Sequence, residues 1–181
     1  MAGLIEDYAI VGDMQSAALI GRDGSVDWLC VPRFDSAACM AALLGDEGHG
    51  QWRISPAGAQ GPAGALGPAG AQGPAGVGPV SRRRYEGSTL ILETEWRTAD
   101  GTVRVIDFMP PRDCQTPRVS DAPVLVRIVE GVQGAVEMEC VWRLRFDSGK
   151  VLPWVRSQTE SGPAIATIAW LMRRTHGRTL P

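Results

Sequence analysis

Paired carboxylates are the first residues in this chain whose spacing could support catalysis. Acid and base cleavage of a glycosidic bond requires two carboxyl groups roughly 5 to 10 Å apart, one protonated and one ionised. Glu93 with Glu95, and Glu137 with Glu139, have that spacing because alternate residues of a strand share a face. Each pair lies opposite an apolar stripe, so the sequence favours carboxylates on a solvated face.

The densest group of unusual residues lies at positions 23–36. Trp28, Arg33, Phe34 and Asp35 cluster there around a proline. Such side chains stack on sugar rings and hydrogen-bond to hydroxyl groups, which makes them candidates for contact with a substrate or a second domain. The alternative is structural: Trp28 and Phe34 would belong to the core, and Arg33 would pair locally with Asp35. The residues alone favour the structural interpretation.

The sequence offers no motif for a metal, a cofactor or a catalytic nucleophile. Its four cysteines, Cys30, Cys39, Cys114 and Cys140, form no CxxC pair, and neither histidine lies at metal-ligand spacing from them. Two histidines do not complete a Ser-His-Asp set, and the glycine-rich stretch lacks the Lys-Ser/Thr of a phosphate loop. We therefore expect buried reduced thiols, no metal and no cofactor.

Composition excludes several classes of protein. The 181 residues are 44% hydrophobic and carry a formal net charge of −2, which argues against a disordered chain and against nucleic acid as a partner. No apolar run reaches the ~18 residues of a membrane span. Glu6 and Asp7 stand where a secretory signal would be positively charged. We expect a cytoplasmic globular protein that binds no membrane.

Two-residue periodicity predicts three hairpins. Their strands are residues 17–20 with 26–30, residues 89–98 with 102–108, and residues 124–129 with 136–146. The first two turns contain Asp-Gly, and the third, at 130–134, contains two glycines. In the last strand one face is apolar throughout: Val136, Met138, Cys140, Trp142, Leu144 and Phe146.

Shorter signals complete the expected fold. A two-turn helix is predicted over residues 37–44, capped by Asp35 or Ser36 and ended by Gly45. Further short strands are predicted at residues 8–11, 52–54, 151–155 and 164–171. Because a sheet with one apolar face must bury it against another layer, we expect an all-β antiparallel sandwich with one short helix.

A biased segment interrupts this pattern at residues 56–79, which hold 8 of the 22 glycines and 5 of the 13 prolines. Glycine recurs at every third position from Gly58 to Gly76, as in collagen. One interpretation is a trimerising triple helix. The other, which we prefer, is an expanded surface loop, because lengthening a loop costs only about 0.6 kcal/mol per doubling.

Several longer stretches resemble, in order, the beginning of glycoside hydrolase family 15 proteins, the bacterial glucoamylase-like and trehalase-like enzymes. They include IEDYAIVGD at 5–13, DGSVDWLCVPRFDSAACMAALLG at 23–45, VIDFMPPRD at 105–113, LVRIVEG at 125–131 and LRFD at 144–147. The resemblance covers roughly residues 5–156. Residues 169–181 do not share it, so we expect a sandwich domain over 1–168 and a divergent tail.

The resemblance implies a β-sandwich domain that precedes a helical (α/α)6 barrel. In the family, two Glu residues of that barrel hydrolyse an α-glucosidic bond with inversion, so no catalytic residue is assigned in this chain. Trp28, Arg33, Phe34 and Asp35 are expected to face the barrel and an α-glucoside in its glucose pocket.

We therefore expect an N-terminal domain, truncated before the barrel by a frame disruption or early stop near residue 169, that is inactive alone. The alternative function is an interaction module that trimerises through its Gly-X-Y segment.

Overall fold

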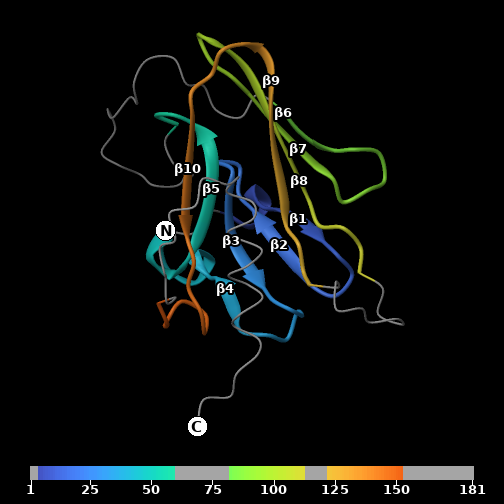
Figure 1. Ribbon diagram of the computed structural model, residues 1–181, viewed down its shortest axis with the longest axis vertical. Helices are drawn as coiled ribbons and strands as arrows, with labels where there is room; N and C mark the ends of the chain where they lie inside the picture. Colours follow the sequence, from blue (N-terminus) through green and yellow to red (C-terminus); the bar gives the residue numbers. More distant parts are fainter. Residues whose placement is uncertain (1–3, 60–81, 113–121, 153–181) are drawn as a thin grey trace, which may run out of the picture.

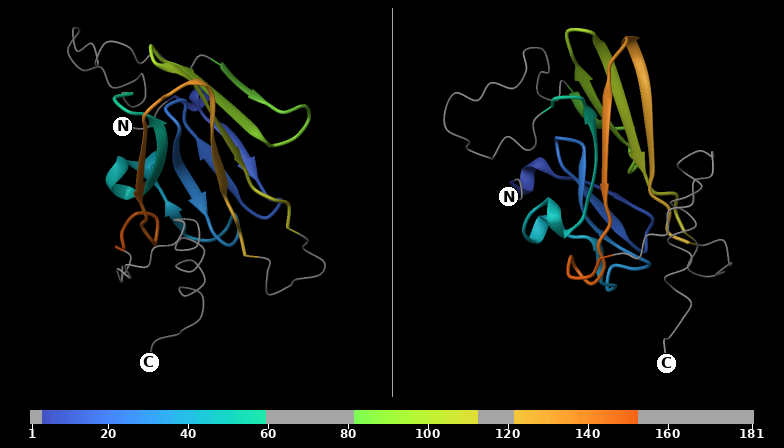
Figure 2. Two further views of the ribbon diagram at one scale, coloured as in Figure 1. Left: turned by 45° about the horizontal axis from the view of Figure 1, so that its top comes forward. Right: turned by 60° about the vertical axis from the view of Figure 1, so that its left-hand side comes forward.

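The computed structural model describes residues 4–59, 82–112 and 122–152, which form two antiparallel sheets packed face to face (Figures 1 and 2). The first sheet has the order β1-β2-β3-β5-β10, with β4 also paired to β3. Its strands are β1 (Ala9–Gly12), β2 (Ala17–Ile20), β3 (Ser25–Cys30), β4 (Ala38–Met40), β5 (Gln51–Pro56) and β10 (Met138–Arg143). This confirms the predicted all-β sandwich.

The second sheet has the order β6-β7-β8-β9. Its strands are β6 (Arg82–Tyr85), β7 (Leu92–Arg97), β8 (Gly101–Phe108) and β9 (Val126–Gly134). Three single-turn 3-10 helices, η1 (Ile5–Asp7), η2 (Ala42–Leu44) and η3 (Glu47–His49), are the helical elements of the described residues. None of the described helices is long and apolar enough to cross a membrane.

Two of the three predicted hairpins are confirmed. β2 pairs antiparallel with β3, and β7 pairs antiparallel with β8 across the Asp-Gly turn. The short strands predicted near residues 8–11 and 52–54 are also present as β1 and β5. These elements depend on local signals, an alternating strand and a tight turn, which a sequence displays directly.

The third hairpin was predicted wrongly. β9 does not end near Val129 but runs on to Gly134, and its partner is β8, whereas β10 pairs with β5 in the other sheet. Gly134 has φ +67°, and a Cβ there would lie 2.1 Å from the carbonyl oxygen of Asp100. The glycine therefore lets the chain leave one sheet and cross to the other, as the upper part of Figure 1 shows.

The apolar face expected for the last strand is present with one exception. Val136, Met138, Trp142 and Phe146 are partly buried against the core and Leu144 is buried, but Cys140 is exposed. Cys30 and Cys39 are buried free thiols, as expected. The expectation of a buried thiol at Cys140 was wrong because this edge of the sheet is covered less than the periodicity implied.

The helix predicted over residues 37–44 is also wrong. Ala38–Met40 form β4, and Gly45, at φ −165°, is not left-handed. Cys39 and Met40 pack in the main core, whereas Ala38 and Ala41 pack in a separate cluster. The buried side chains of this stretch are divided between two clusters, and a two-turn helix is marginal without one continuous apolar stripe.

The main core lies between the sheets. Its buried members come from both layers: Val11, Ala18, Ile20, Val26, Leu29, Cys39, Met40, Leu92, Met109 and Leu144. A smaller cluster of Ile54, Trp96, Val103 and Val105 continues it. The two layers thus bury their apolar faces against each other, as a sandwich requires.

The strands on either side of the biased segment lie in different sheets. Trp52 belongs to β5 and Tyr85 to β6, and the Tyr85 hydroxyl donates to the carbonyl oxygen of Ile10 across the sandwich at 2.9 Å. Pro56, the first residue of the segment at 56–79, ends β5, and residues 60–79 of the segment lie outside the described residues. The same holds for Cys114, for most of the strand predicted at 151–155, for the strand predicted at 164–171 and for the expected tail.

Candidate functional site

The loop between β3 and β4 carries three of the four residues that the sequence singled out, at the lower end of the sandwich in Figure 1. Arg33, Phe34 and Asp35 follow the cis peptide bond between Val31 and Pro32. A loop at the end of a rigid sandwich is a common place for binding residues. What holds this loop in position therefore decides whether it can present a fixed surface.

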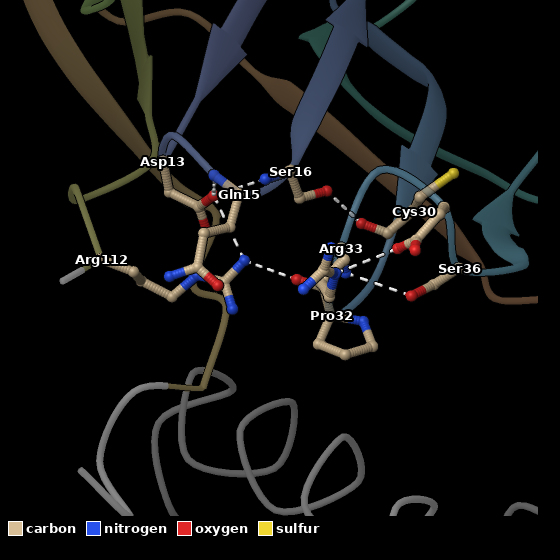
Figure 3. Close-up of polar contacts among 9 residues, drawn as sticks. Asp13, Gln15, Ser16, Cys30, Pro32, Arg33, Ser36 and Arg112 are labelled. Atoms are coloured by element: carbon tan, nitrogen blue, oxygen red, sulfur yellow. Dashed lines mark hydrogen bonds and ion pairs between the residues drawn. The ribbon is translucent and has the colours of Figure 1, made fainter. Parts of the chain in front are cut away.

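An arginine from the other sheet anchors the loop (Figure 3). Arg112, just beyond β8, donates from Nε to Oδ2 of Asp13 at 2.5 Å and from Nη2 to the carbonyl oxygen of Pro32 at 2.5 Å. The Arg112 and Asp13 side chains are 8% and 0% exposed. Such a shielded, charge-assisted contact fixes geometry far better than a surface pair does.

Asp13 also organises the loop between β1 and β2. Its Oδ1 accepts hydrogen bonds from the backbone N–H of Gln15 at 3.0 Å and of Ser16 at 2.7 Å. The carbonyl oxygen of Gln15 in turn accepts from the N–H of Phe34 at 2.9 Å. Ser16 Oγ donates to the carbonyl oxygen of Cys30, at the end of β3. The start of the β3–β4 loop and its central residue are thereby tied to the β1–β2 loop.

The loop tip is exposed. Arg33 Nε lies 3.1 Å from Asp35 Oδ1, with side chains 68% and 74% exposed, so the expected local pair is confirmed. The Arg33 N–H also donates to Ser36 Oγ at 3.2 Å. Phe34 is 62% exposed and belongs to no core cluster of the described residues, so its expected burial was wrong. A loop that turns back within a few residues leaves its central side chain pointing outward.

Trp28 does not join the tip. It lies in β3 opposite Leu19 and packs, partly buried, against Cys30, Ala38 and Ala41. Trp28 therefore supports the strand before the loop and β4 after it. The structure brings Arg33, Phe34 and Asp35 together in one loop and separates Trp28 from them.

Asp13 and Arg112 are residues whose role in this loop sequence reasoning missed. They lie 99 positions apart, so their pairing leaves no local signal. The one available hint is positional: Asp13 follows Gly12 at a strand end, and Arg112 follows two prolines at the end of another strand. Polar residues at strand ends often anchor loops, but the sequence does not show which of them pair, because pairing depends on the topology of the sheets.

A second buried carboxylate belongs to Asp27 in β3. It accepts from the Tyr8 hydroxyl at 2.8 Å and from Nε2 of Gln51 at 2.9 Å, and the residue is 5% exposed. Both donors are neutral, so the three side chains form a satisfied polar network that joins the N-terminal segment, β3 and β5. This arrangement is structural and presents no second acid beside the first.

Both glutamates of the first pair, Glu93 and Glu95, are bound to arginines. Glu93 Oε2 lies 2.7 Å from Arg84, and the hydrogen bond from that guanidinium lowers the pKa of Glu93. Glu95 lies 3.8 Å from Arg104. A general acid needs a raised pKa, so an arginine-bound glutamate is poorly suited to the task.

The second glutamate pair is no better suited to catalysis. Glu139 lies 2.8 Å from Arg53, and Glu137 is exposed. Both observations fit the carboxylates of a solvated face that the sequence favoured. Within residues 4–59, 82–112 and 122–152, no group of three His, Cys, Asp or Glu side chains could hold a metal ion.

Comparison with known proteins finds a matching family and several similar proteins. The model of the family described as "Trehalase-like, N-terminal" matches residues 1–152. The trehalases of Mycolicibacterium smegmatis and Mycobacterium tuberculosis are 35% and 34% identical to this chain over 175 residues, covering 90% of it. The trehalase of Thermoplasma volcanium is 23% identical over 150 residues. No solved structure matches the chain.

The length covered in these relatives is small. The match spans 23% of each of the two mycobacterial trehalases and 21% of the Thermoplasma protein. The family match itself covers all but the last 29 positions of the 181-residue sequence, and it contains every strand described above. The chain therefore belongs to the family of trehalase-like N-terminal domains.

Proposed function

We propose that this chain is the non-catalytic N-terminal domain of a family 15 glycoside hydrolase that cleaves α-glucosidic bonds, with trehalose or maltooligosaccharides as substrates. The observation that carries the proposal is the family match over residues 1–152. The relatives are trehalases, and the match leaves more than three quarters of each mycobacterial protein to other domains. A helical barrel that holds the two catalytic glutamates is the proposed partner.

The geometry of the described residues supports the absence of catalysis in this part. The acid and base of a glycosidase must have different protonation states at one pH, which requires one carboxyl group in an apolar or anionic environment. The neighbouring glutamates of β7 instead contact arginines, and Asp27 has no carboxyl partner in its network. The proposed role is therefore structural support and shaping of the pocket rim.

The β3–β4 loop is the proposed contribution to that rim. Arg112 anchors it through Asp13 and Pro32, so Phe34 is presented on a fixed backbone without being packed into the core. Its ring can cover a sugar or an apolar residue of the barrel, and the Arg33–Asp35 pair supplies donors and acceptors for hydroxyl groups. Trp28 holds the adjoining strands.

A direct test is an assay of the purified 181-residue chain with trehalose and with maltose. The proposal predicts no glucose above a heat-inactivated control. Release of glucose from either sugar would refute it, because all catalytic groups would then lie within this chain.

The loop can be tested in a chimera that carries this chain in place of the matching quarter of the M. smegmatis trehalase. Phe34→Ala at the exposed tip should raise KM for trehalose more than it lowers kcat, because the ring contributes to binding and touches no reacting bond. Met14→Ala, at a residue of the β1–β2 loop that is 80% exposed against 62% for Phe34, is the control and should change neither value. Equal KM and kcat values for the two variants would show that the loop does not contribute to the pocket rim.

A further inference from the structure

Four apolar side chains form a compact block on the outward face of the second sheet. Strand register sets Ile106 of β8 directly opposite Ile128 of β9, and Phe108 opposite Val126. Residues directly opposite in an antiparallel pair project to the same face. The alternate residues of β8 are buried between the sheets, so this block, which we name the apolar square, faces away from the core.

A row of alternating charges borders the apolar square. Register aligns Arg82, Glu95, Arg104 and Glu130 across all four strands of the sheet. Arg104 lies 3.8 Å from Glu95 and 3.4 Å from Glu130. The row holds two arginines and two glutamates, and Arg104 is paired with both glutamates, so the row offers little net attraction to a charged partner. A partner of this face gains binding energy chiefly by burying the apolar square.

The two outer faces of the sandwich differ in how they are covered. On the first sheet, Trp28 packs against Ala38 and Ala41, and Tyr8 reaches Asp27 from the N-terminal segment. On the second sheet Ile128 remains 46% exposed. A sheet normally needs one apolar face, which this sheet already buries in the core, and an apolar block on its other face points to a third layer.

We propose that the apolar square is the surface on which this domain packs against the helical partner domain, through one amphipathic helix. The inference rests on the proposed function, which supplies that partner from the three quarters of each mycobacterial relative outside the match. A helix presents apolar side chains three and four residues apart, about 5–6 Å from one another. Adjacent strands about 4.8 Å apart give the square a comparable spacing.

The test uses the full-length chimera with the M. smegmatis trehalase and a matched pair of substitutions. Ile128→Lys charges the apolar square. Val132→Lys changes a β-branched residue of the same strand with the same 46% exposure, four residues away. Denaturation by urea of the 181-residue chain carrying each substitution checks that both variants still fold.

The predicted result is a loss of coupling between the domains in the Ile128→Lys chimera only. Proteolytic cleavage between the domains should accelerate by about tenfold or more, as expected when a buried isoleucine is replaced by a charge. The Val132→Lys chimera should be cleaved within about twofold of the unsubstituted chimera.

Three outcomes would overturn the inference in different ways. Equal rates of cleavage in the two variants, when the unsubstituted chimera is active and its domains are coupled, would show that the apolar square is not part of the domain interface. The proposed function would not be affected by that result. An unsubstituted chimera that folds as two independent domains without activity would refute the proposed function as well. Dimerisation of the isolated chain that Ile128→Lys abolishes would assign the square to a second copy.

Discussion

Two arginine–aspartate pairs in this domain are chemically alike and lie in opposite surroundings. Arg127 and Asp107 meet between the sheets at 2.7 Å, with side chains 0% and 1% exposed. Arg33 and Asp35 meet at 3.1 Å on the loop tip, largely in solvent. The same two groups therefore hold the sandwich together in one region and stay available to a partner in the other.

The buried pair acts through more than its own contact. Arg127 of β9 also donates to the carbonyl oxygens of Trp52 in β5 at 2.6 Å and of Gly24 in the β2–β3 turn at 2.7 Å. Its guanidinium lies 5.2 Å from the centroid of the Trp52 ring. The pair thus joins the layers with directional bonds, where an apolar contact would leave their relative position less defined.

Arg83 repeats this arrangement at another edge of the sandwich. It donates from β6 to the carbonyl oxygen of Asp7 at 2.6 Å and also to that of Ile20. Burial lowers the pKa of Arg83. Arg83 and Arg127 of the second sheet, and Arg112 beyond the end of β8, thus donate to backbone carbonyls of the strands, loops and turns of the first layer.

Removing the buried cation should have the largest effect. Arg127→Met leaves Asp107 buried without a partner and should lower the free energy of unfolding by about 3–5 kcal/mol, measured by urea denaturation. The double variant Arg127→Met, Asp107→Leu should recover a large part of that loss because no buried charge remains. A loss of unfolding free energy below about 1 kcal/mol for the single variant would mean that the Arg127–Asp107 pair stabilises the fold no more than an exposed pair such as Arg33–Asp35 does.

Removing the loop anchor should have the next largest effect. Arg112→Met breaks the contacts to Asp13 and Pro32 and should cost about 2–3 kcal/mol. Hydrogen exchange should accelerate at the amide of Phe34, which bonds to Gln15, and should change little in β7 and β8. Unchanged exchange at Phe34 would show that the loop is rigid without its anchor.

The cysteines extend the contrast between buried and exposed groups. Burial raises the pKa of Cys39 to about 12, whereas Cys140 is exposed. Iodoacetamide at pH 8, mapped by mass spectrometry, should modify Cys140 well before Cys39. Faster labelling of Cys39 would contradict its burial.

The same raised pKa predicts a loss of stability in alkali. The unfolded thiol ionises near 9.0 and the folded thiol near 12, so the unfolded state binds fewer protons in between. The stabilisation is complete below about pH 9 and declines toward pH 12, by up to about 1.4 kcal/mol per pH unit. Cys39→Ala should flatten the slope of unfolding free energy against pH, and an unchanged slope would exclude Cys39 as its source.

The smallest effect is expected for the exposed pair. A double-mutant cycle of Arg33→Ala and Asp35→Ala should give a coupling energy of about 0.5 kcal/mol or less that declines with added salt. A coupling above about 2 kcal/mol would mean that the loop tip is shielded, and would weaken its assignment as a contact surface.

Local signals account for the parts of the fold that the sequence predicted. The hairpins of β2 with β3 and of β7 with β8 depend on adjacent strands and an Asp-Gly turn. The pairing of Arg33 with Asp35 is likewise confined to one loop. In each case the interacting residues are close in the chain, so composition and spacing contain the information.

Long-range contacts account for the parts that were wrong or missed. β9 and β10 are neighbours in sequence, but β8 and β5 are their partners, and a periodic pattern does not name a partner. Residues 38–41 have good helical composition, but their side chains pack in two separate clusters, one of them the main core. The anchor between Asp13 and Arg112 depends on the same topology, so the loop could be recognised from sequence while its support could not.

A comparison of glucose release from trehalose by the isolated chain and by its full-length chimera with the M. smegmatis trehalase tests the assignment of a non-catalytic domain most directly. The chain alone should release no glucose, and the chimera should hydrolyse trehalose. Hydrolysis by the isolated chain, or a folded chimera without activity, would contradict the assignment.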